Sequence, residues 1–231
     1  MRRPLALSLG LITGLCLASP ALAELEFSLY GGVQSAPHSE LSISGDTEIA
    51  DRDFTAGWEG RSFEMPPHYG LRATWWWEND WGVGVDFNHL KVYADDETLE
   101  ESGLDHLEFT DGLNLLTVNG YRRFPGALDG ALDGALGGAL GNATPYLGAG
   151  LGLAVPYVEV REGEAETFEY QVTGPAAALI AGLSVPVADR WSVFGEYKGT
   201  YSRNEADLEG GGTLETDIVT NALNLGVSFR F

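Results

Sequence analysis

The feature that most constrains the fold of this chain is a two-residue alternation of large apolar residues with small or polar ones. In segment 222–231 the apolar residues all fall on one face: Leu223, Leu225, Val227, Phe229 and Phe231. A period of two is that of a β-strand, because successive side chains point to opposite faces. One face is uniformly large, while the other mixes small and charged residues. This pattern suits a barrel with lipid outside and a filled polar lumen.

Seven further segments repeat the alternation: residues 25–33, 69–78, 81–88, 113–121, 147–155, 177–185 and 191–198. The pattern is weakest in 113–121, where the adjacent Leu115 and Leu116 indicate an ambiguous facing or a β-bulge. Together with 222–231 the segments number eight, an even number that lets every strand pair when the sheet closes on itself. The sequence therefore predicts an all-β fold, an eight-stranded antiparallel up-and-down transmembrane β-barrel.

The first 23 residues have the pattern of a cleavable signal peptide. Two arginines precede an apolar stretch, 5–17, and Ala21-Leu22-Ala23 matches a cleavage site. We therefore expect a signal peptide at 1–23 and a mature domain at 24–231, integral to the bacterial outer membrane. The only cysteine, Cys16, lies inside the signal segment, so we expect no disulfide in the mature protein. No later segment holds the roughly 18 consecutive apolar residues of a transmembrane helix.

Charge and aromatic residues orient the predicted barrel. The net charge of −21 argues against nucleic acid as a partner. Acidic residues gather in 40–64, 95–108, 162–169 and 205–217, which we interpret as long outer loops; 79–80 and 186–190 are short periplasmic turns. Aromatic residues near the periplasmic ends predict an interfacial girdle: Trp75, Trp77, Trp81, Phe124, Trp191 and Phe231. The terminal Phe231 also resembles the closing aromatic residue by which the barrel assembly machinery recognises its clients.

One predicted periplasmic connection, residues 124–144, is too long for a turn. It contains a repeated Ala-Leu-Asp-Gly pattern. We interpret the segment as a low-complexity periplasmic insert without chemistry of its own. A short helix that docks on another protein is the alternative.

The histidines are the clearest candidates for chemistry. All four, His38, His68, His89 and His106, fall at the predicted outer end of the first half of the barrel. Charged residues lie in or beneath the same region: Glu59, Arg61, Glu64, Arg72 and Asp86. Imidazole and carboxylate groups suit a transition metal, so the pattern predicts a shared metal site. The alternative is that the loop histidines are solvated, and strict alternation would turn His89 toward lipid.

The stretch 58–67 is unusual for a loop because it is aromatic, charged and stiffened by two prolines. Such a segment could form a lid over the mouth of the lumen. Equally, it could be an ordinary loop anchored at the membrane interface by Trp58 and Phe63.

Several strings resemble the lipid A oxidase family of α-proteobacterial outer-membrane barrels. They are GVQSAPHS at 32–39, GWEGRSFE at 57–64 with YGLR at 69–72, VDFNHLKVYA at 85–94 and HLEFTDGLN at 106–114. The resemblance covers the first four predicted strands, and the second half matches only as a generic barrel. The insert at 124–144 is a departure from the family.

The resemblance implies oxidation of the proximal glucosamine of lipid A to 2-aminogluconate by molecular oxygen. Dioxygen reacts poorly with closed-shell sugars, so an oxidase needs a redox centre. The sequence shows no dinucleotide-binding fold, so the redox centre that remains is a metal, iron or copper. Lipid A or lipopolysaccharide is the implied partner, and we expect a monomer.

The residues implied for this reaction fall into three groups. The metal ligands are His38, His89, His106 and Asp111, with His68 as the alternate ligand. The catalytic carboxylates are Glu59, Glu64 and Asp86, with Glu59 as the base. The substrate-binding residues are Arg61, Arg72 and Trp58. Two other functions stay open: a non-enzymatic barrel of the OmpA-like or OmpW-like kind, structural or pore-forming, and another lipid A modifier such as a deacylase.

Overall fold

The computed structural model describes residues 24–129 and 141–231. The predicted signal peptide and residues 130–140 of the predicted insert lie outside the described residues. The described elements are β1 (Glu24–Ser35), β2 (Ser39–Ser44), β3 (Arg52–Ala56), β4 (Trp58–Glu59), β5 (Tyr69–Trp76), β6 (Trp81–Ala94), α1 (Asp96–Ser102), β7 (His106–Arg123), β8 (Thr144–Ala154), β9 (Tyr157–Glu162), β10 (Ala165–Tyr170), β11 (Gly174–Ala188), β12 (Trp191–Asp207) and β13 (Thr213–Arg230). Within these ranges no helix is long and apolar enough to cross a membrane.

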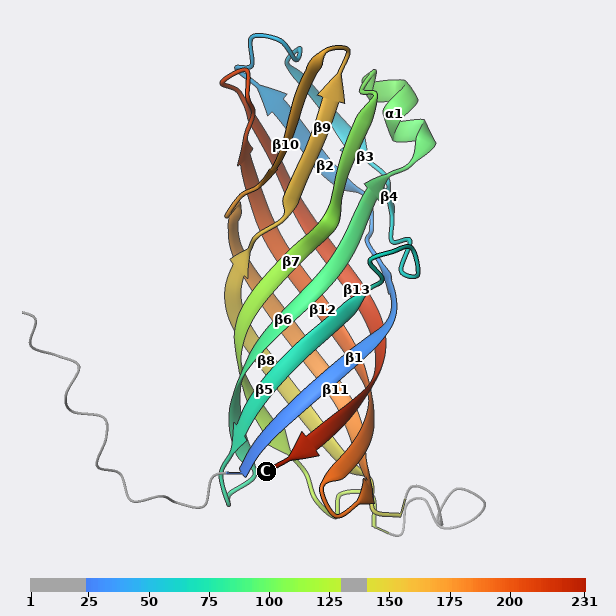
Figure 1. Ribbon diagram of the computed structural model, residues 1–231, viewed down its shortest axis with the longest axis vertical. Helices are drawn as coiled ribbons and strands as arrows, with labels where there is room; N and C mark the ends of the chain where they lie inside the picture. The colour runs from blue at the N-terminus through green and yellow to red at the C-terminus, as the bar shows by residue number, and fades with distance from the viewer. Residues whose placement is uncertain (1–23, 130–140) are drawn as a thin grey trace, which may run out of the picture.

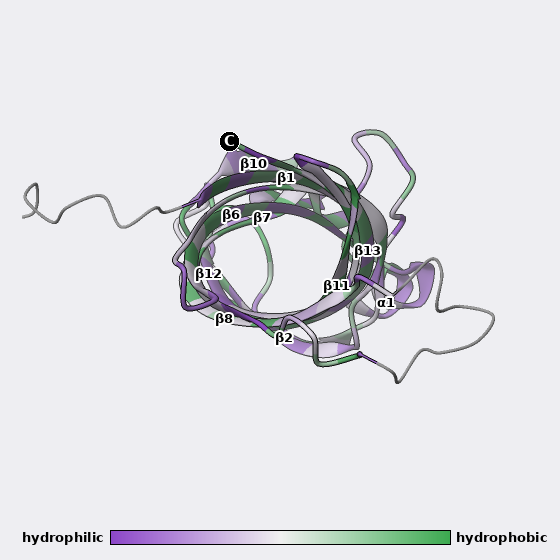
Figure 2. Ribbon diagram, turned by 90° about the horizontal axis from the view of Figure 1, so that it is seen from below, coloured by the Kyte–Doolittle hydropathy of each residue, from purple (hydrophilic) through white to green (hydrophobic). Residues whose placement is uncertain are grey.

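Eight long strands form a closed antiparallel barrel (Figure 1). Its order is β1, β5, β6, β7, β8, β11, β12 and β13, and β13 returns to pair with β1 from Glu26–Arg230 to Ser35–Asn221. Figure 2 looks along the axis and shows the strands as a ring. The predicted fold class is confirmed. Both described chain ends lie at the lower end of Figure 1, so the opposite end is called the upper end below.

The predicted facing of the strands is also confirmed. Leu225 is 75% exposed on the outer wall, whereas its neighbour Asn224 is 2% exposed and faces the lumen. The same alternation holds for the apolar residues of β1, β5, β6, β8 and β12. Large apolar side chains on the outside and polar ones within are the arrangement expected of a barrel in lipid.

The weak fourth strand contains a bulge just before the ambiguous segment. Leu90 of β6 pairs with Leu113 of β7, but Val92 pairs with Phe109, so residues 110–112 stand opposite one residue of β6. Gly112, with φ +107°, supplies the backbone conformation that this bulge requires. After the bulge the pairing is regular, and Leu115 faces inward while Leu116 is 48% exposed.

The acidic blocks are more ordered than the loops that we expected. The hairpin of β2 and β3 pairs with β13, and the hairpin of β9 and β10 pairs with β7, which extends the barrel upward (Figure 1). Inward residues of these strands form an apolar core at the mouth; they include Leu41, Ile43, Leu107, Val158 and Val160. The polar-lumen prediction is therefore wrong for the upper part, because the inward residues of these strands are apolar and alternate with polar or charged ones on the outside.

An ion pair joins the two hairpins. A guanidinium nitrogen of Arg52 in β3 lies 2.5 Å from the carboxylate of Glu162 in β9. The hydrogen bond from Arg52 holds the pKa of Glu162 below its usual range. The charge pair therefore ties together two segments that are 110 residues apart in the sequence.

The first testable prediction concerns the outward facing of Leu225. Leu225→Arg places a charge near the middle of the spanning part of β13, so we expect a loss of about 2–4 kcal/mol in the free energy of unfolding. The measurement is denaturant unfolding in phospholipid vesicles. The control is Glu205→Arg at an exposed position of the upper extension. Equal effects of the two variants would contradict the assigned facing.

Candidate functional site

Two groups of charged residues are candidates for function, and the first lies in the lumen. Arg72 of β5 donates hydrogen bonds to Asp86 of β6 at 2.6 Å and to Glu196 of β12 at 2.8 and 3.0 Å. Lys198 of β12 contacts Asp86 at 2.9 Å. None of the four side chains is more than 5% exposed. Two cations and two anions thus compensate one another across the barrel.

Tyrosines complete this lumen network. The Tyr30 hydroxyl donates to Asp86 at 2.7 Å, and the Tyr146 hydroxyl donates to Glu196 at 2.7 Å. Asp86 and Arg72, which we predicted as a catalytic and a substrate-binding residue, therefore bind each other inside the barrel. The structure separates both from the lipid-facing surface.

The second group lies on the outer wall at the upper end. Glu59 of β4 pairs with Tyr93 of β6, Tyr93 pairs with Glu108 of β7, and Glu108 pairs with Glu159 of β9. The four residues form one row across four strands, and neighbouring strands are about 4.8 Å apart. We call the row and its neighbours the outer-wall cluster; its members are Glu59, Arg61, Glu64, Lys91, Tyr93, His106, Glu108 and Glu159.

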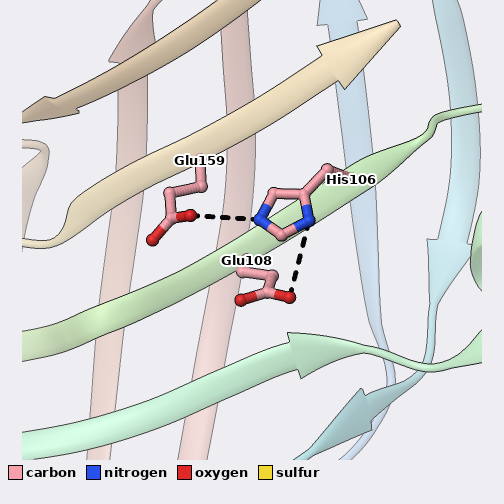
Figure 3. Close-up of side chains that lie close together, drawn as sticks. All are labelled: His106, Glu108 and Glu159. Atoms are coloured by element: carbon pink, nitrogen blue, oxygen red, sulfur yellow. Dashed lines mark hydrogen bonds and ion pairs between the residues drawn. The ribbon is translucent and has the colours of Figure 1, made fainter. Parts of the chain in front are cut away.

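His106 is held between two carboxylates of this cluster (Figure 3). Its Nε2 lies 3.0 Å from Glu159 Oε2, and its Nδ1 lies 3.6 Å from Glu108 Oε1. The side chains are only 25%, 16% and 18% exposed for His106, Glu159 and Glu108 respectively. His106 and Glu108 share a face because they are two residues apart on β7. The imidazole also makes an edge contact with Phe168 of β10.

Two cations, Arg61 and Lys91, lie beside the part of the row that Glu59 and Tyr93 form. The Arg61 guanidinium lies 4.4 Å from the centre of the Tyr93 ring and 2.9 Å from Glu59. Lys91 Nζ lies 5.1 Å from the centre of the same ring and donates to the backbone oxygen of Glu64 at 3.0 Å. Arg61 has a φ of +28°, an uncommon value for a residue other than glycine. This backbone turn brings the guanidinium back onto the wall.

The structure does not bring the four histidines together. His68 contacts Asn224 at 2.8 Å and the backbone oxygen of His89 at 3.0 Å. By strand parity His89 points outward, yet it is only 4% exposed, since it stacks on Tyr69 and contacts Asn114 at 2.9 Å. His38 is exposed in the turn after β1.

The predicted metal ligands therefore do not converge. Asp111 is exposed in the bulge of β7. Among residues 24–129 and 141–231, one set of three such side chains has ligand atoms within 4.8 Å of one another, namely His106, Glu108 and Glu159. Of the predicted ligands His38, His89, His106 and Asp111, this set contains only His106.

The stretch 58–67 divides between the core and the outer wall. Trp58, which we predicted as substrate-binding, is 7% exposed, donates to Ser39 Oγ at 2.8 Å and packs near Phe109. Phe63 and Met65, by contrast, are 76% and 84% exposed. The loop between β4 and β5 lies outside the barrel wall rather than across its mouth (Figure 1), so the lid interpretation is wrong.

Four members of the cluster were missed by the sequence reasoning: Lys91, Tyr93, Glu108 and Glu159. For two of them the sequence contained a feature that could have identified them. Lys91 breaks the apolar outward face of its strand, and Glu108 follows His106 by two residues. Glu159 gave no signal, because the strand that carries it, β9, was not predicted.

The donor set of His106, Glu108 and Glu159 fits a divalent transition metal in part. Imidazole suits iron, copper or zinc, and carboxylate suits harder ions such as manganese. The two carboxylates lie against different ring nitrogens (Figure 3). An ion on Nε2 would therefore be shared with Glu159, while Glu108 would orient the ring through its other nitrogen, as outer-shell carboxylates do.

A closed barrel with an apolar outer wall and a polar, ion-paired interior defines an integral outer-membrane β-barrel. The chain belongs to the outer membrane protein β-barrel domain family, whose model matches residues 7–231. Among curated protein sequences, none matches the chain.

The solved structures that are similar to the chain include the following three. Neisserial surface protein A is 15% identical, with 90% of this chain and 97% of that chain covered and a TM-score of 0.47. The attachment invasion locus protein Ail of Yersinia pestis is 12% identical, with 87% and 98% covered and a TM-score of 0.37. The outer membrane protease OmpT of Escherichia coli is 9% identical, with 93% and 99% covered and a TM-score of 0.34.

The second prediction concerns the lumen network. Asp86→Ala leaves Arg72 and Lys198 to share Glu196, so one buried positive charge loses its partner and we expect a loss of about 3–5 kcal/mol in the free energy of unfolding. The control is Glu215→Ala, whose pair with Arg203 is exposed and 3.9 Å long, with an expected loss below about 1 kcal/mol. Unfolding in vesicles measures both, and a small effect of Asp86→Ala would show that the network adds little to stability.

Proposed function

We propose that this outer-membrane barrel is a lipid A oxidase-like enzyme that acts at the outer leaflet. The observation that carries the proposal is the outward row of Glu59, Tyr93, Glu108 and Glu159 beside His106. It lies on the outer wall above the exposed apolar residues of the strands, where we expect the lipid headgroups. The family resemblance of segments 85–94 and 106–114, which contribute to this row, supports the same reaction.

The proposed reaction is a two-electron oxidation at the anomeric carbon of the proximal glucosamine. That carbon loses its hydrogen, and its hydroxyl loses a proton, which gives a lactone. Dioxygen accepts the two electrons and two protons and becomes hydrogen peroxide. Water then opens the lactone to 2-aminogluconate, so the product carries one oxygen atom more than the substrate. The substrate must therefore have a free anomeric hydroxyl.

The roles of the cluster residues follow from their positions. His106 and Glu159 would hold a redox metal, iron or copper, which supplies the one-electron chemistry that dioxygen and a closed-shell sugar lack. Glu59, exposed at the end of the row, would accept the hydroxyl proton. Arg61 would orient anionic groups of the lipid by charge-assisted hydrogen bonds. Glu64, a member of the cluster, and Asp111 in the nearby bulge of β7 would tune the local charge.

The lumen argues against the pore alternative. The ion pairs around Arg72 span the barrel, and an apolar core fills the mouth above them. Among the residues that the structure describes, these groups obstruct the lumen, whereas conduction needs an open polar lumen. A purely structural role for the barrel is the second candidate function, and the third test decides between it and the oxidase.

The third prediction is that His106→Ala and Glu159→Gln abolish oxidation while the barrel still folds. Mass spectrometry of lipid A from strains with and without the wild-type gene should show a gain of one oxygen atom. For the purified variants in detergent, we expect loss of bound metal and loss of hydrogen peroxide formation. Glu59→Gln should keep the metal and lower the rate by about 100-fold or more.

The matched control is Glu205→Gln. Glu205 is exposed in the upper part of β12, three strands away from β7, which carries His106. This variant should oxidise lipid A at the wild-type rate. An unchanged lipid A spectrum in the wild-type strain would reject the oxidase and leave the structural barrel. Full activity of His106→Ala would reject the metal site.

A further inference from the structure

A furrow crosses the lipid-facing wall below the loop between β4 and β5. Its floor is a row of laterally paired residues in which Gly31 of β1 and Gly195 of β12 flank Leu225 of β13. The row continues to Tyr69 on one side and to Leu183 on the other. The glycines carry no side chain, so the wall is hollowed on both sides of Leu225.

Bulky rows border the furrow above and below. The upper row joins Val33, Leu223 and Tyr197, and the lower row joins Leu29, Val227 and Val193. All six residues are 41–63% exposed on the lipid-facing wall. The upper row lines one groove together with Gly31 and Gly195, and the lower row lies two residues further down each strand. Because strands of such barrels are tilted by about 35–45°, a row perpendicular to them descends across the membrane. The furrow therefore runs obliquely downward from Tyr69 near the upper rim.

The loop between β4 and β5 connects this furrow to the outer-wall cluster. Phe63 lines the furrow, while Arg61, two residues earlier, lies over Tyr93 in the cluster. The loop is fixed to the wall between them, since Ser62 Oγ accepts a hydrogen bond from the backbone nitrogen of Gln34 at 2.9 Å. One short segment thus presents a cation on one side and an exposed aromatic ring on the other.

We propose that the furrow holds one acyl chain of a lipid A molecule whose anionic headgroup is bound by Arg61. The wall faces hydrocarbon, so the occupant of the furrow is an acyl chain. The cation at the upper end complements a phosphate, and lipid A joins phosphorylated sugars directly to acyl chains. This inference rests on the proposed function for its choice of lipid, and it adds the element that would hold the sugar beside the outer-wall cluster.

Two observations make Gly195 the position to test. It has an ordinary backbone conformation, and a Cβ added there would meet Leu225 Cδ2 at 3.5 Å, a normal contact distance. A larger side chain at this position therefore fills the furrow without straining the strand. Gly120 of β7 is a matched control, because a Cβ there would meet only the backbone oxygen of Ala149, at 4.0 Å. Gly120 lines a different hollow, beside Trp81 and Phe124 at the lower end.

The fourth prediction is tested by native mass spectrometry of the purified barrel titrated with a monophosphorylated hexa-acylated lipid A that has a free anomeric hydroxyl. We expect the wild type to retain one lipid, and Gly195→Leu to bind about tenfold more weakly or worse, since displaced methylene contacts are lost. Phe63→Ser should also weaken lipid binding. Because Phe63 lies in an exposed loop, we expect this variant to fold. Arg61→Ala should weaken the binding of lipid A, but not the binding of an uncharged diacylglycerol probe.

Three outcomes decide the inference. Gly120→Leu should bind lipid A as the wild type does; an equal loss in Gly120→Leu and Gly195→Leu would overturn the furrow as a specific site. Unchanged binding in both Gly195→Leu and Phe63→Ser would also overturn it. Glu159→Gln should bind lipid A normally without oxidising it, so failure of the oxidase proposal is distinguishable from failure of the lipid site.

Discussion

The structure depends on the pairing of its first strand with its last. A membrane interior offers no water to the backbone, so each amide and carbonyl of a spanning strand needs a partner within the protein. The ladder between β1 and β13 supplies these partners for the two strands that would otherwise be edges. Once the ring is closed, its circumference fixes which residues meet in the lumen.

The lumen must then be filled, and the chain fills it in two different ways. In the membrane-spanning part, side chains from β5, β6 and β12 meet as two compensated ion pairs with tyrosines around them. Buried charges of this kind require partners for every group, because an uncompensated ion in a low dielectric is costly. Toward the upper end, apolar residues of the two hairpins pack together in the manner of a soluble core. The barrel is therefore part membrane protein and part small globular domain.

The fold could be predicted from the sequence because a period of two repeats over eight segments and leaves little choice of architecture. The facing of Leu225 and Asn224 followed from that period alone. The hairpins escaped prediction because their apolar residues are few and alternate with polar or acidic ones, a pattern that also describes a solvated loop. Leu41 and Ile43 of β2 are the example.

The candidate site was harder to predict than the fold, because closeness in a barrel depends on lateral pairing rather than on sequence position. Arg61, Glu59, Glu64 and His106 were predicted and do lie on the same stretch of outer wall. His38, His89 and His106 share one end of the barrel, but facing and register send their side chains to different surroundings. Glu159 joins His106 only through the pairing of β7 with β9, which no local pattern encodes.

The bulge of β7 has a consequence for how such a site can vary. Three residues stand opposite one, so the strand gains two residues, an even number. An even insertion preserves the alternation, and His106 and Glu108 stay on the same outer face as Leu116 further down the strand. A change of one residue would instead turn the imidazole and carboxylate into the apolar mouth and bring Leu107 and Phe109 to the surface. Length changes in this strand are therefore compatible with the fold only in steps of two.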